Sequence, residues 1–273
     1  AEEGLSELDM YLKLVELSDR AGSIYLGRYY NDEIVQRFKN ESRAISMLDH
    51  PNIVRVHDVS VWDKTQFIVM ELIEGVDLKQ FMIYNGGKLT WKETVKFAED
   101  TLQALQHAHE HGIVHRDIKP QNVVVDPEGI CHIIDFGISR FYDGEKSRDT
   151  VIMGTRITAP PEQFGYRETD TRSDLYSMGV LLHYCITGEY EISEESLSDL
   201  DPAISRIVRK ATMFDPDSRY QSAGELLSDL TSARYGTHSQ SESNRPVSRR
   251  PFRILAGFIA AGLILAGGTV YNT

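Results

Sequence analysis

Residues 115–122 read HRDIKPQN, a polar loop that is followed by two short β-branched runs, Val123–Val125 and Ile130–Ile134. The Asp-Pro-Glu-Gly stretch between the two runs is typical of a tight turn, so the pattern predicts an antiparallel hairpin. Pairing in such a hairpin brings the start of the first strand beside the end of the second, which places Asn122 near Asp135. An amide oxygen and a carboxylate fixed at one edge of a rigid hairpin make a hard-oxygen site suited to Mg²⁺.

The loop also carries a base and a cation. Asp117 supplies a carboxylate, and Lys119 supplies a positive charge that neutralises phosphate. Before the loop, apolar residues recur at helical spacing through residues 94–111, and Gly112 ends this predicted helix. The chain therefore presents a base, a cation and two metal ligands where a helix meets a hairpin.

The HRDIKPQN loop and the later Asp-Phe-Gly triplet resemble the catalytic and metal-binding loops of eukaryotic-like protein kinases, and the lysine two residues after the aspartate resembles the serine/threonine type. The resemblance implies that Asp117 orients or deprotonates the substrate hydroxyl and that Lys119 neutralises the γ-phosphate. It also implies that Asn122 and Asp135 hold Mg²⁺. The implied function is phosphorylation of serine and threonine hydroxyls on protein substrates, with Mg-ATP bound between two lobes.

Other segments resemble the nucleotide-binding parts of the same family. The apolar strand Gln66–Met70 leads into a segment that resembles the hinge beside the adenine ring, which implies contacts at Glu71 and Ile73. Glu41 occupies the position of the glutamate on the family's mobile helix. Gly22 occupies the position of one of the glycines in the family's phosphate-binding loop. The implied cofactors are ATP and Mg²⁺.

A further set of residues resembles the end of the family's activation segment and its supports. Glu162 stands in Pro-Pro-Glu where the family usually has Ala-Pro-Glu, and Arg219 matches the arginine that pairs with this glutamate. Asp174 resembles the aspartate of a buried helix that ties down the catalytic loop. His115 is expected to pack against Phe136.

Two threonines in the same region are candidate regulatory residues. Thr155 resembles the threonine that contacts substrate near Asp117, and Thr150 lies in an exposed polar run. Arg116 precedes the catalytic aspartate, and we expect it to bind a phosphate on Thr150 and so order the segment.

These motifs predict an α+β, two-lobed protein-kinase-like fold. Residues 10–75 form a small N-lobe with an antiparallel sheet and one helix, and residues 76–232 form a larger, mainly helical C-lobe. A juxtamembrane linker is predicted over residues 233–253, and a C-terminal transmembrane helix over residues 254–271.

The predicted N-lobe departs from the family pattern. Gly22 is the only one of the expected loop glycines, and no strand carrying the ATP lysine lies between Tyr25–Arg28 and the helix of Glu41. Lys39 belongs to the same helix as Glu41 and is a poor substitute. We therefore expect an N-lobe sheet that lacks one strand, with a first strand at Tyr11–Leu17. Either the kinase is degenerate, or a stretch of N-lobe is missing from this chain.

Three functions follow from this pattern. The first is an active serine/threonine protein kinase, favoured because the base, the lysine and both metal ligands are retained. The second is a catalytically impaired pseudokinase that acts as a membrane-tethered binding and regulatory module. The third, a small-molecule kinase of the antibiotic-phosphotransferase type, is disfavoured because those relatives lack the activation segment found here.

The composition is that of a folded chain, with 41% hydrophobic and 26% charged residues, which argues against disorder and against a polytopic membrane protein. The net charge is −12, and because residues 231–273 carry +4, residues 1–230 carry −16. A body this acidic is a poor partner for nucleic acid. The two cysteines cannot form a disulfide framework and fit a reducing compartment.

The tail predicts a membrane anchor. Residues 254–271 contain no charged side chain, and as a helix they would be about 27 Å long, close to the hydrocarbon thickness of a bilayer. Arginines within residues 249–253 place the preceding domain in the cytoplasm of a single-pass cell-membrane protein. Small residues four apart, such as Ala256 and Ala260, permit two such helices to pack closely. A homodimer is therefore one expected arrangement.

Overall fold

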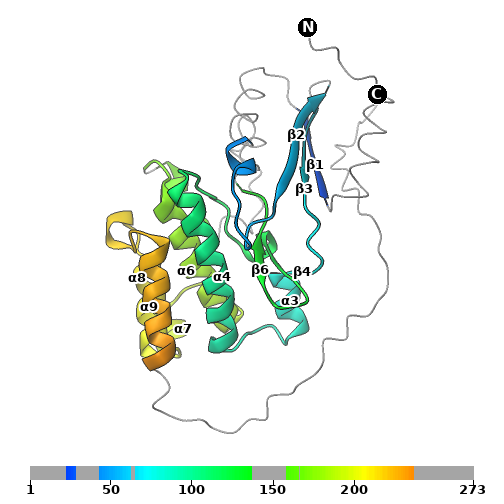
Figure 1. Ribbon diagram of the computed structural model, residues 1–273. Coiled ribbons are helices and arrows are strands. Elements are labelled where there is room, and N and C mark those ends of the chain that lie inside the picture. The colour runs from blue at the N-terminus through cyan, green and yellow to red at the C-terminus, as the bar shows by residue number, and fades with distance from the viewer. Residues whose placement is uncertain (1–22, 29–42, 63–64, 137–157, 166, 237–273) are drawn as a thin grey trace, which may run out of the picture. The chain divides into compact units, whose positions relative to one another are not determined.

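The computed structural model describes residues 23–28, 43–62, 65–136, 158–165 and 167–236 (Figure 1). The described residues fall into two compact units: one contains residues up to 73 except 50–53, and the other contains residues 50–53 and the chain from residue 74 onward. The first unit is built on an antiparallel sheet and the second is mainly helical, as the α+β prediction requires.

The N-terminal unit contains a three-stranded antiparallel sheet in the order β1-β3-β2. Its strands are β1 (Ser23–Arg28), β2 (Val56–Trp62) and β3 (Thr65–Met70). The central strand β3 ends in three buried apolar residues, Ile68, Val69 and Met70, as expected for a strand with neighbours on both sides. β1 pairs directly with β3, from Ser23 opposite Met70 to Arg28 opposite Thr65.

The predicted hairpin is confirmed in the second unit. β5 (Val123–Val125) pairs with β6 (Cys131–Ile133), with Val123 opposite Ile133. The second strand is one residue shorter at each end than the apolar run predicted. β4 (Val76–Asp77) adds a third strand beside β5, and Gly75 permits this approach because a Cβ there would lie 2.3 Å from the Val125 carbonyl oxygen.

Six α-helices and three short 3₁₀ turns complete the described part of this unit. The helices are α3 (Leu78–Tyr84), α4 (Trp91–Glu110), α6 (Thr171–Thr187), α7 (Glu194–Ser198), α8 (Pro202–Ala211) and α9 (Ala223–Gly236). The 3₁₀ turns are η1 (Pro120–Asn122), η3 (Pro161–Phe164) and η4 (Pro216–Ser218). Figure 1 shows α4 running beside α6 and α9.

The helix predicted before the catalytic loop is confirmed as α4. A capping box of Thr90 and Glu93 starts it, and its predicted apolar face is buried from Val95 to Ala108. α6 is buried along most of its length, and Gly179 lets it approach α8, since a Cβ there would lie 2.6 Å from the Ala211 Cβ.

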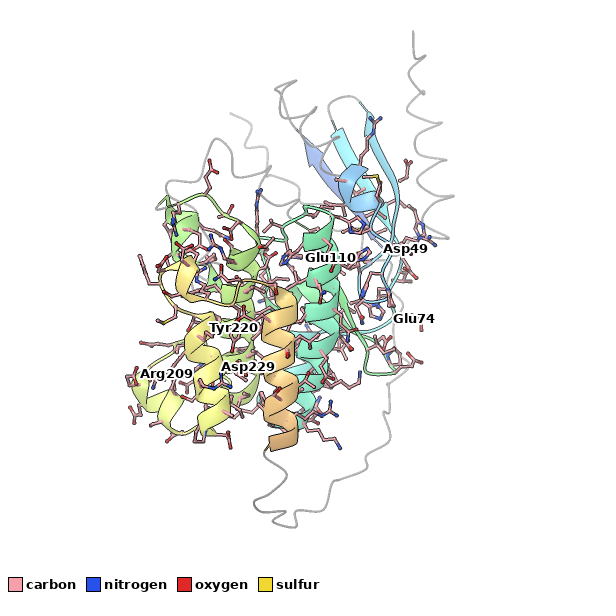
Figure 2. All side chains as sticks on the ribbon, turned by 60° about the vertical axis from the view of Figure 1, so that its left-hand side comes forward. Asp49, Glu74, Glu110, Arg209, Tyr220 and Asp229 are labelled. Carbon is pink, nitrogen blue, oxygen red and sulfur yellow. The ribbon has the colours of Figure 1, made fainter. Side chains whose placement is uncertain are left out.

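Polar contacts join α8 and α9 on the outer side of the unit. Arg206 donates two hydrogen bonds of 2.7 Å to Asp229, and the Tyr220 hydroxyl donates a third of 2.6 Å to the same carboxylate. Figure 2 labels Tyr220 and Asp229. A bidentate pair of this kind favours one orientation of the arginine and carboxylate, and so helps to set how α8 lies against α9.

Residues 50–53 belong with the second unit although they lie inside the N-terminal sequence. The backbone carbonyl of Asn52 accepts the N–H of Ile133 at 2.8 Å. The side-chain amide of Asn52 donates to the Cys131 carbonyl, also at 2.8 Å. Ile53 adds a parallel bridge to Ile133. These bonds fix the short segment to the outer strand of the hairpin.

The predicted first strand at Tyr11–Leu17 and the apolar segment 254–271 lie outside the described residues. The linker predicted at 233–253 does so only from residue 237, because α9 continues to Gly236, past the predicted end of the C-lobe at residue 232. Among the described helices, none combines the length and apolar character needed to cross a bilayer.

Candidate active site

Three of the four predicted catalytic residues form one cluster in the loop before the hairpin. Lys119 Nζ lies 2.6 Å from Asp117 Oδ2, and Asn122 Nδ2 donates to the same oxygen at 3.0 Å and to the Asp117 carbonyl at 2.8 Å. With both hydrogens of its amide nitrogen used on Asp117, Asn122 is held so that its own Oδ1 is left for another partner.

Asp135 lies at the same end of the hairpin as Asn122, as predicted. The Ile134 N–H donates to the Asn122 carbonyl at 3.0 Å, which places Asp135 one residue beyond this pairing. Asp135 adopts a left-handed backbone conformation, with φ of 60°, which is uncommon for a residue other than glycine. Such strain persists only where the surrounding structure holds the residue in place.

The electrostatics of Asp135 suit a cation. Burial raises the pKa of its carboxyl, and the positive charge of Lys119 offsets this only in part. A divalent cation would favour the charged form and supply the missing compensation. No cluster of three or more His, Cys, Asp or Glu side chains in the described residues could hold a metal alone. The side-chain oxygens of Asn122 and Asp135 are donors of the kind that suits Mg²⁺, an ion that usually takes its other ligands from water and phosphate.

Asp174 ties down the backbone of the loop, as predicted. The carboxylate is fully buried in α6 and accepts the N–H of His115 at 2.8 Å and the N–H of Arg116 at 2.6 Å. Arg116 needs this support because its φ of 68° also lies in the left-handed region.

Asp174 also contacts a third group that sequence reasoning did not predict. His109 Nε2, from α4, lies 2.8 Å from Asp174 Oδ2. Its spacing from Asp174 in the sequence carries no local pattern that could have indicated the contact.

His115 packs against Phe136, as predicted, with ring centroids 4.7 Å apart. Its Nε2–H donates to the Ile134 carbonyl at 3.0 Å, and its Nδ1 accepts the Asp117 N–H at 3.2 Å. This pattern requires a neutral ring, in agreement with burial, which lowers the pKa of His115. His115 is therefore a structural link between the catalytic loop and the hairpin.

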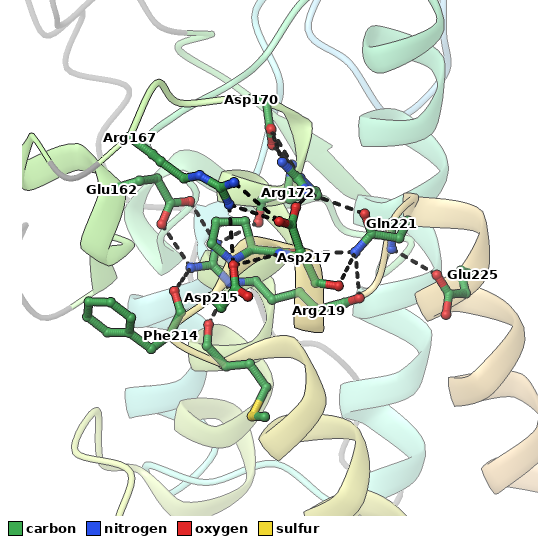
Figure 3. Close-up of polar contacts among 12 residues, drawn as sticks. Glu162, Arg167, Asp170, Arg172, Phe214, Asp215, Asp217, Arg219, Gln221 and Glu225 are labelled. Carbon is green, nitrogen blue, oxygen red and sulfur yellow. Dashed lines mark hydrogen bonds and ion pairs between the residues drawn. The ribbon is translucent and has the colours of Figure 1, made fainter.

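The predicted pairing of Glu162 with Arg219 is present and buried (Figure 3). Burial alone would raise the pKa of Glu162, but its hydrogen bonds to Arg219 and Ser173 outweigh this and lower it. Arg219 also donates to the carbonyls of Met213 and Phe214, so it joins η3 to the chain after α8.

The predicted adenine-binding segment follows β3 in the N-terminal unit. The Glu71 N–H donates to the Arg55 carbonyl at 2.9 Å. Among the described residues, no backbone carbonyl accepts the Ile73 N–H. The predicted contact residues Gly22 and Glu41 and the regulatory residues Thr150 and Thr155 lie outside the described residues.

Known proteins resemble this chain in both sequence and structure. The sequence model of the protein kinase domain matches residues 26–239. The chain is 37% identical over 220 residues to a probable serine/threonine-protein kinase of Clostridium perfringens, covering 73% of this chain and 32% of that protein. It is 33% identical over 248 residues to the serine/threonine-protein kinase PrkC of Bacillus subtilis, covering 82% and 38%.

The chain thus spans about a third of the length of these curated relatives. Among solved structures, the kinase domain of Mycobacterium tuberculosis PknI matches with a TM-score of 0.60 and 23% identity, covering 78% of this chain and 91% of that structure. This likeness supports the fold.

Proposed function

The chain belongs to the protein kinase family, and we propose that it transfers the terminal phosphoryl group of ATP to serine and threonine hydroxyls of protein substrates. One observation carries the proposal: Lys119 and Asn122 both contact Asp117 Oδ2. A base, a cation and a metal ligand are thereby held in one constellation beside Asp135.

Each of these residues has a distinct role in the proposed reaction. One carboxylate oxygen of Asp117, Oδ2, is bound by Lys119 and Asn122. In the proposed reaction the other oxygen faces the substrate hydroxyl and accepts its proton. Lys119 places a positive charge beside the oxygens of the transferring group. Asn122 Oδ1 and the Asp135 carboxylate would hold Mg²⁺, which screens the charge of the phosphates when bound.

The alternative is a catalytically impaired pseudokinase that acts as a binding and regulatory module. It is favoured by the N-terminal sheet, since none of its three described strands contains a lysine. The direct pairing of β1 with β3 fits a sheet that lacks the lysine-bearing strand expected between them. The retained Asp117 cluster favours the active enzyme.

The test is transfer of labelled phosphate from ATP to a protein acceptor by the full chain. Asp117→Asn and Asp135→Asn should each lower turnover by at least about 100-fold, since each removes a charge from the reaction. The matched control is Asp126→Asn, which changes a carboxylate in the hairpin turn that pairs with His132. Unchanged turnover in either site variant, or no transfer by the unaltered chain, contradicts the proposal.

We also propose that the domain is regulated and tethered. A phosphate on Thr150 bound by Arg116 would order the activation segment, and Thr155 would contact substrate near Asp117. Residues 254–271 would anchor the protein in the cell membrane, with the kinase domain on the cytoplasmic side. Pairing of two such helices would make it a homodimer.

A further inference from the structure

The peptide group that leads into Asp117 is held by a side chain from outside the catalytic loop. Gln163 Nε2 donates to the Arg116 carbonyl at 2.8 Å. That carbonyl belongs to the peptide bond joining Arg116 to Asp117. On the other side of the same residue, the Arg116 N–H is bound by Asp174 at 2.6 Å. Side chains from two separate elements thus hold both backbone polar groups of Arg116.

These two bonds matter because the backbone of Arg116 is strained. Its φ of 68° is unfavourable for a residue with a Cβ, and such a conformation persists only under outside constraint. Releasing the carbonyl lets the Arg116–Asp117 peptide plane rotate. That rotation redirects the Asp117 side chain relative to Lys119 and Asn122.

The η3 turn that carries the donor Gln163 is itself held in place at several points. Pro161 begins the η3 turn, and Gly165 ends it in a left-handed conformation with φ of 95°. The Gln163 N–H closes the turn on the Pro160 carbonyl at 3.0 Å. The neighbouring Glu162 is anchored by Arg219 through the buried ion pair. Gln163 is therefore presented to the catalytic loop from a fixed position.

We propose that Gln163 is a positioning residue for Asp117, acting through the Arg116 carbonyl. The inference rests on the proposed kinase function and deepens it. Because Gln163 directly follows Glu162, a shift of the η3 turn moves the peptide that carries the base. The amide thereby links the segment that resembles the end of the activation segment to the orientation of Asp117.

The chain offers a matched comparison in a second glutamine, Gln221, whose Oε1 accepts from Arg172 Nη1 at 3.3 Å. Gln221 Nε2 also donates to backbone carbonyls, those of Pro216 and Arg219, at 3.1 and 2.8 Å. It contacts none of residues 115–122. Replacing Gln221 therefore measures the effect of losing a carbonyl-binding amide whose hydrogen bonds do not reach Asp117.

The experiment compares Gln163→Met and Gln221→Met in the full chain. Gln163→Met keeps the length of the side chain and removes the donor, and it should lower kcat about five- to tenfold, with KM for ATP unchanged and a midpoint of urea unfolding that falls no further than that of Gln221→Met. Gln221→Met should leave kcat unchanged. Gln163→Glu should be at least as impaired as Gln163→Met near neutral pH, because a glutamate carboxyl is ionised well above about pH 4.3 and then cannot donate to the Arg116 carbonyl.

Hydrogen exchange supplies a readout that does not need activity. The amides of Arg116 and Asp117 should exchange faster in Gln163→Met and at the original rate in Gln221→Met. If the unaltered chain transfers no phosphate, the proposed function fails, and the exchange rates alone decide the positioning role. Unchanged kcat and exchange in Gln163→Met, or equal losses in both variants, would overturn the inference.

Discussion

Arg219 donates two hydrogen bonds to Glu162, from Nη1 to Oε1 at 2.7 Å and from Nη2 to Oε2 at 2.8 Å, and both side chains are at most 3% exposed. The remaining Arg219 donors are satisfied by backbone carbonyls, and Ser173 donates to Glu162 at 2.7 Å. A pair so completely hydrogen-bonded is the condition under which burial of two charges is tolerated. It fixes η3, and with it Gln163, to the helical unit.

Removing Arg219 should destabilise the helical unit strongly. Arg219→Met leaves the Glu162 carboxylate buried without its cation, which costs about 3–5 kcal/mol of the free energy of unfolding. Urea unfolding followed by circular dichroism measures the loss. The control is Arg209→Met, which breaks the solvent-exposed pair with Glu194 and should have a much smaller effect. Similar losses in the two variants would contradict a special role for the buried pair.

The stability of the helical unit should fall as the pH is lowered below about 6.5. Burial lowers the pKa of three histidines, His50, His115 and His183, and the charge of His107 adds to the effect at His50. The folded state therefore binds fewer protons than the unfolded state in this range, so protonation favours unfolding. Each histidine contributes a slope of at most about 1.4 kcal/mol per pH unit.

Urea midpoints at pH 7.5 and 5.5 check this dependence. His183→Gln should flatten it, because the ring between the Glu189 carbonyl and Ser196 can no longer be protonated. His57→Gln, at an exposed position on β2, should retain the full dependence. A midpoint that rises toward pH 5.5 in the unaltered protein would show that the sign is wrong.

Much of the site was predictable because its determinants are local. The β-branched runs and the turn between them specified the β5–β6 hairpin, and pairing across that turn placed Asn122 beside Ile134. The helical spacing of apolar residues specified the buried face of α4. The contacts of Asp174 and Arg219 followed from family resemblance, which carries information about tertiary structure that periodicity lacks.

What the sequence did not reveal consists of contacts between polar residues far apart in the chain. Gln163 reaches Arg116 across 47 residues, and His109 reaches Asp174 across 65. The docking of residues 50–53 on the hairpin rests on Asn52 and Cys131, 79 residues apart. Isolated polar residues form no periodic pattern in the sequence, so only the folded structure shows which of them are in contact.

Deleting residues 252–273 should release the protein from membranes into the soluble fraction. The expectation rests on the uncharged segment 254–271, whose transfer out of a bilayer exposes a long apolar surface to water. Fractionation of cells expressing the full and shortened chains measures it. Exchanging Arg249 and Arg250 for serine serves as a control, since the apolar segment remains and the protein should stay with the membrane. A shortened chain that still sediments with membranes would rule out this anchor.

ATP binding should depend steeply on Mg²⁺, and ATP and ADP should bind with similar affinity. The sequence has Gly22 alone of the expected loop glycines, and the described strands of the N-terminal sheet contain no lysine. We expect adenine to bind the backbone around Glu71 and Ile73, because such contacts need neither of these features. The phosphates then depend on Lys119 and on Mg²⁺ held by Asn122 and Asp135.

Calorimetric titration of each nucleotide with and without Mg²⁺ measures this dependence. Asp135→Asn should weaken Mg-ATP binding, whereas the hairpin variant Asp126→Asn should not. Inserting a family-like glycine loop and lysine strand between Ser18 and Asn31 should favour ATP over ADP and raise turnover at least about tenfold, which corresponds to about 1.4 kcal/mol in the barrier. Tight ATP binding by the unaltered chain without Mg²⁺ would mean that another cation, such as Arg20 or Lys39, holds the phosphates.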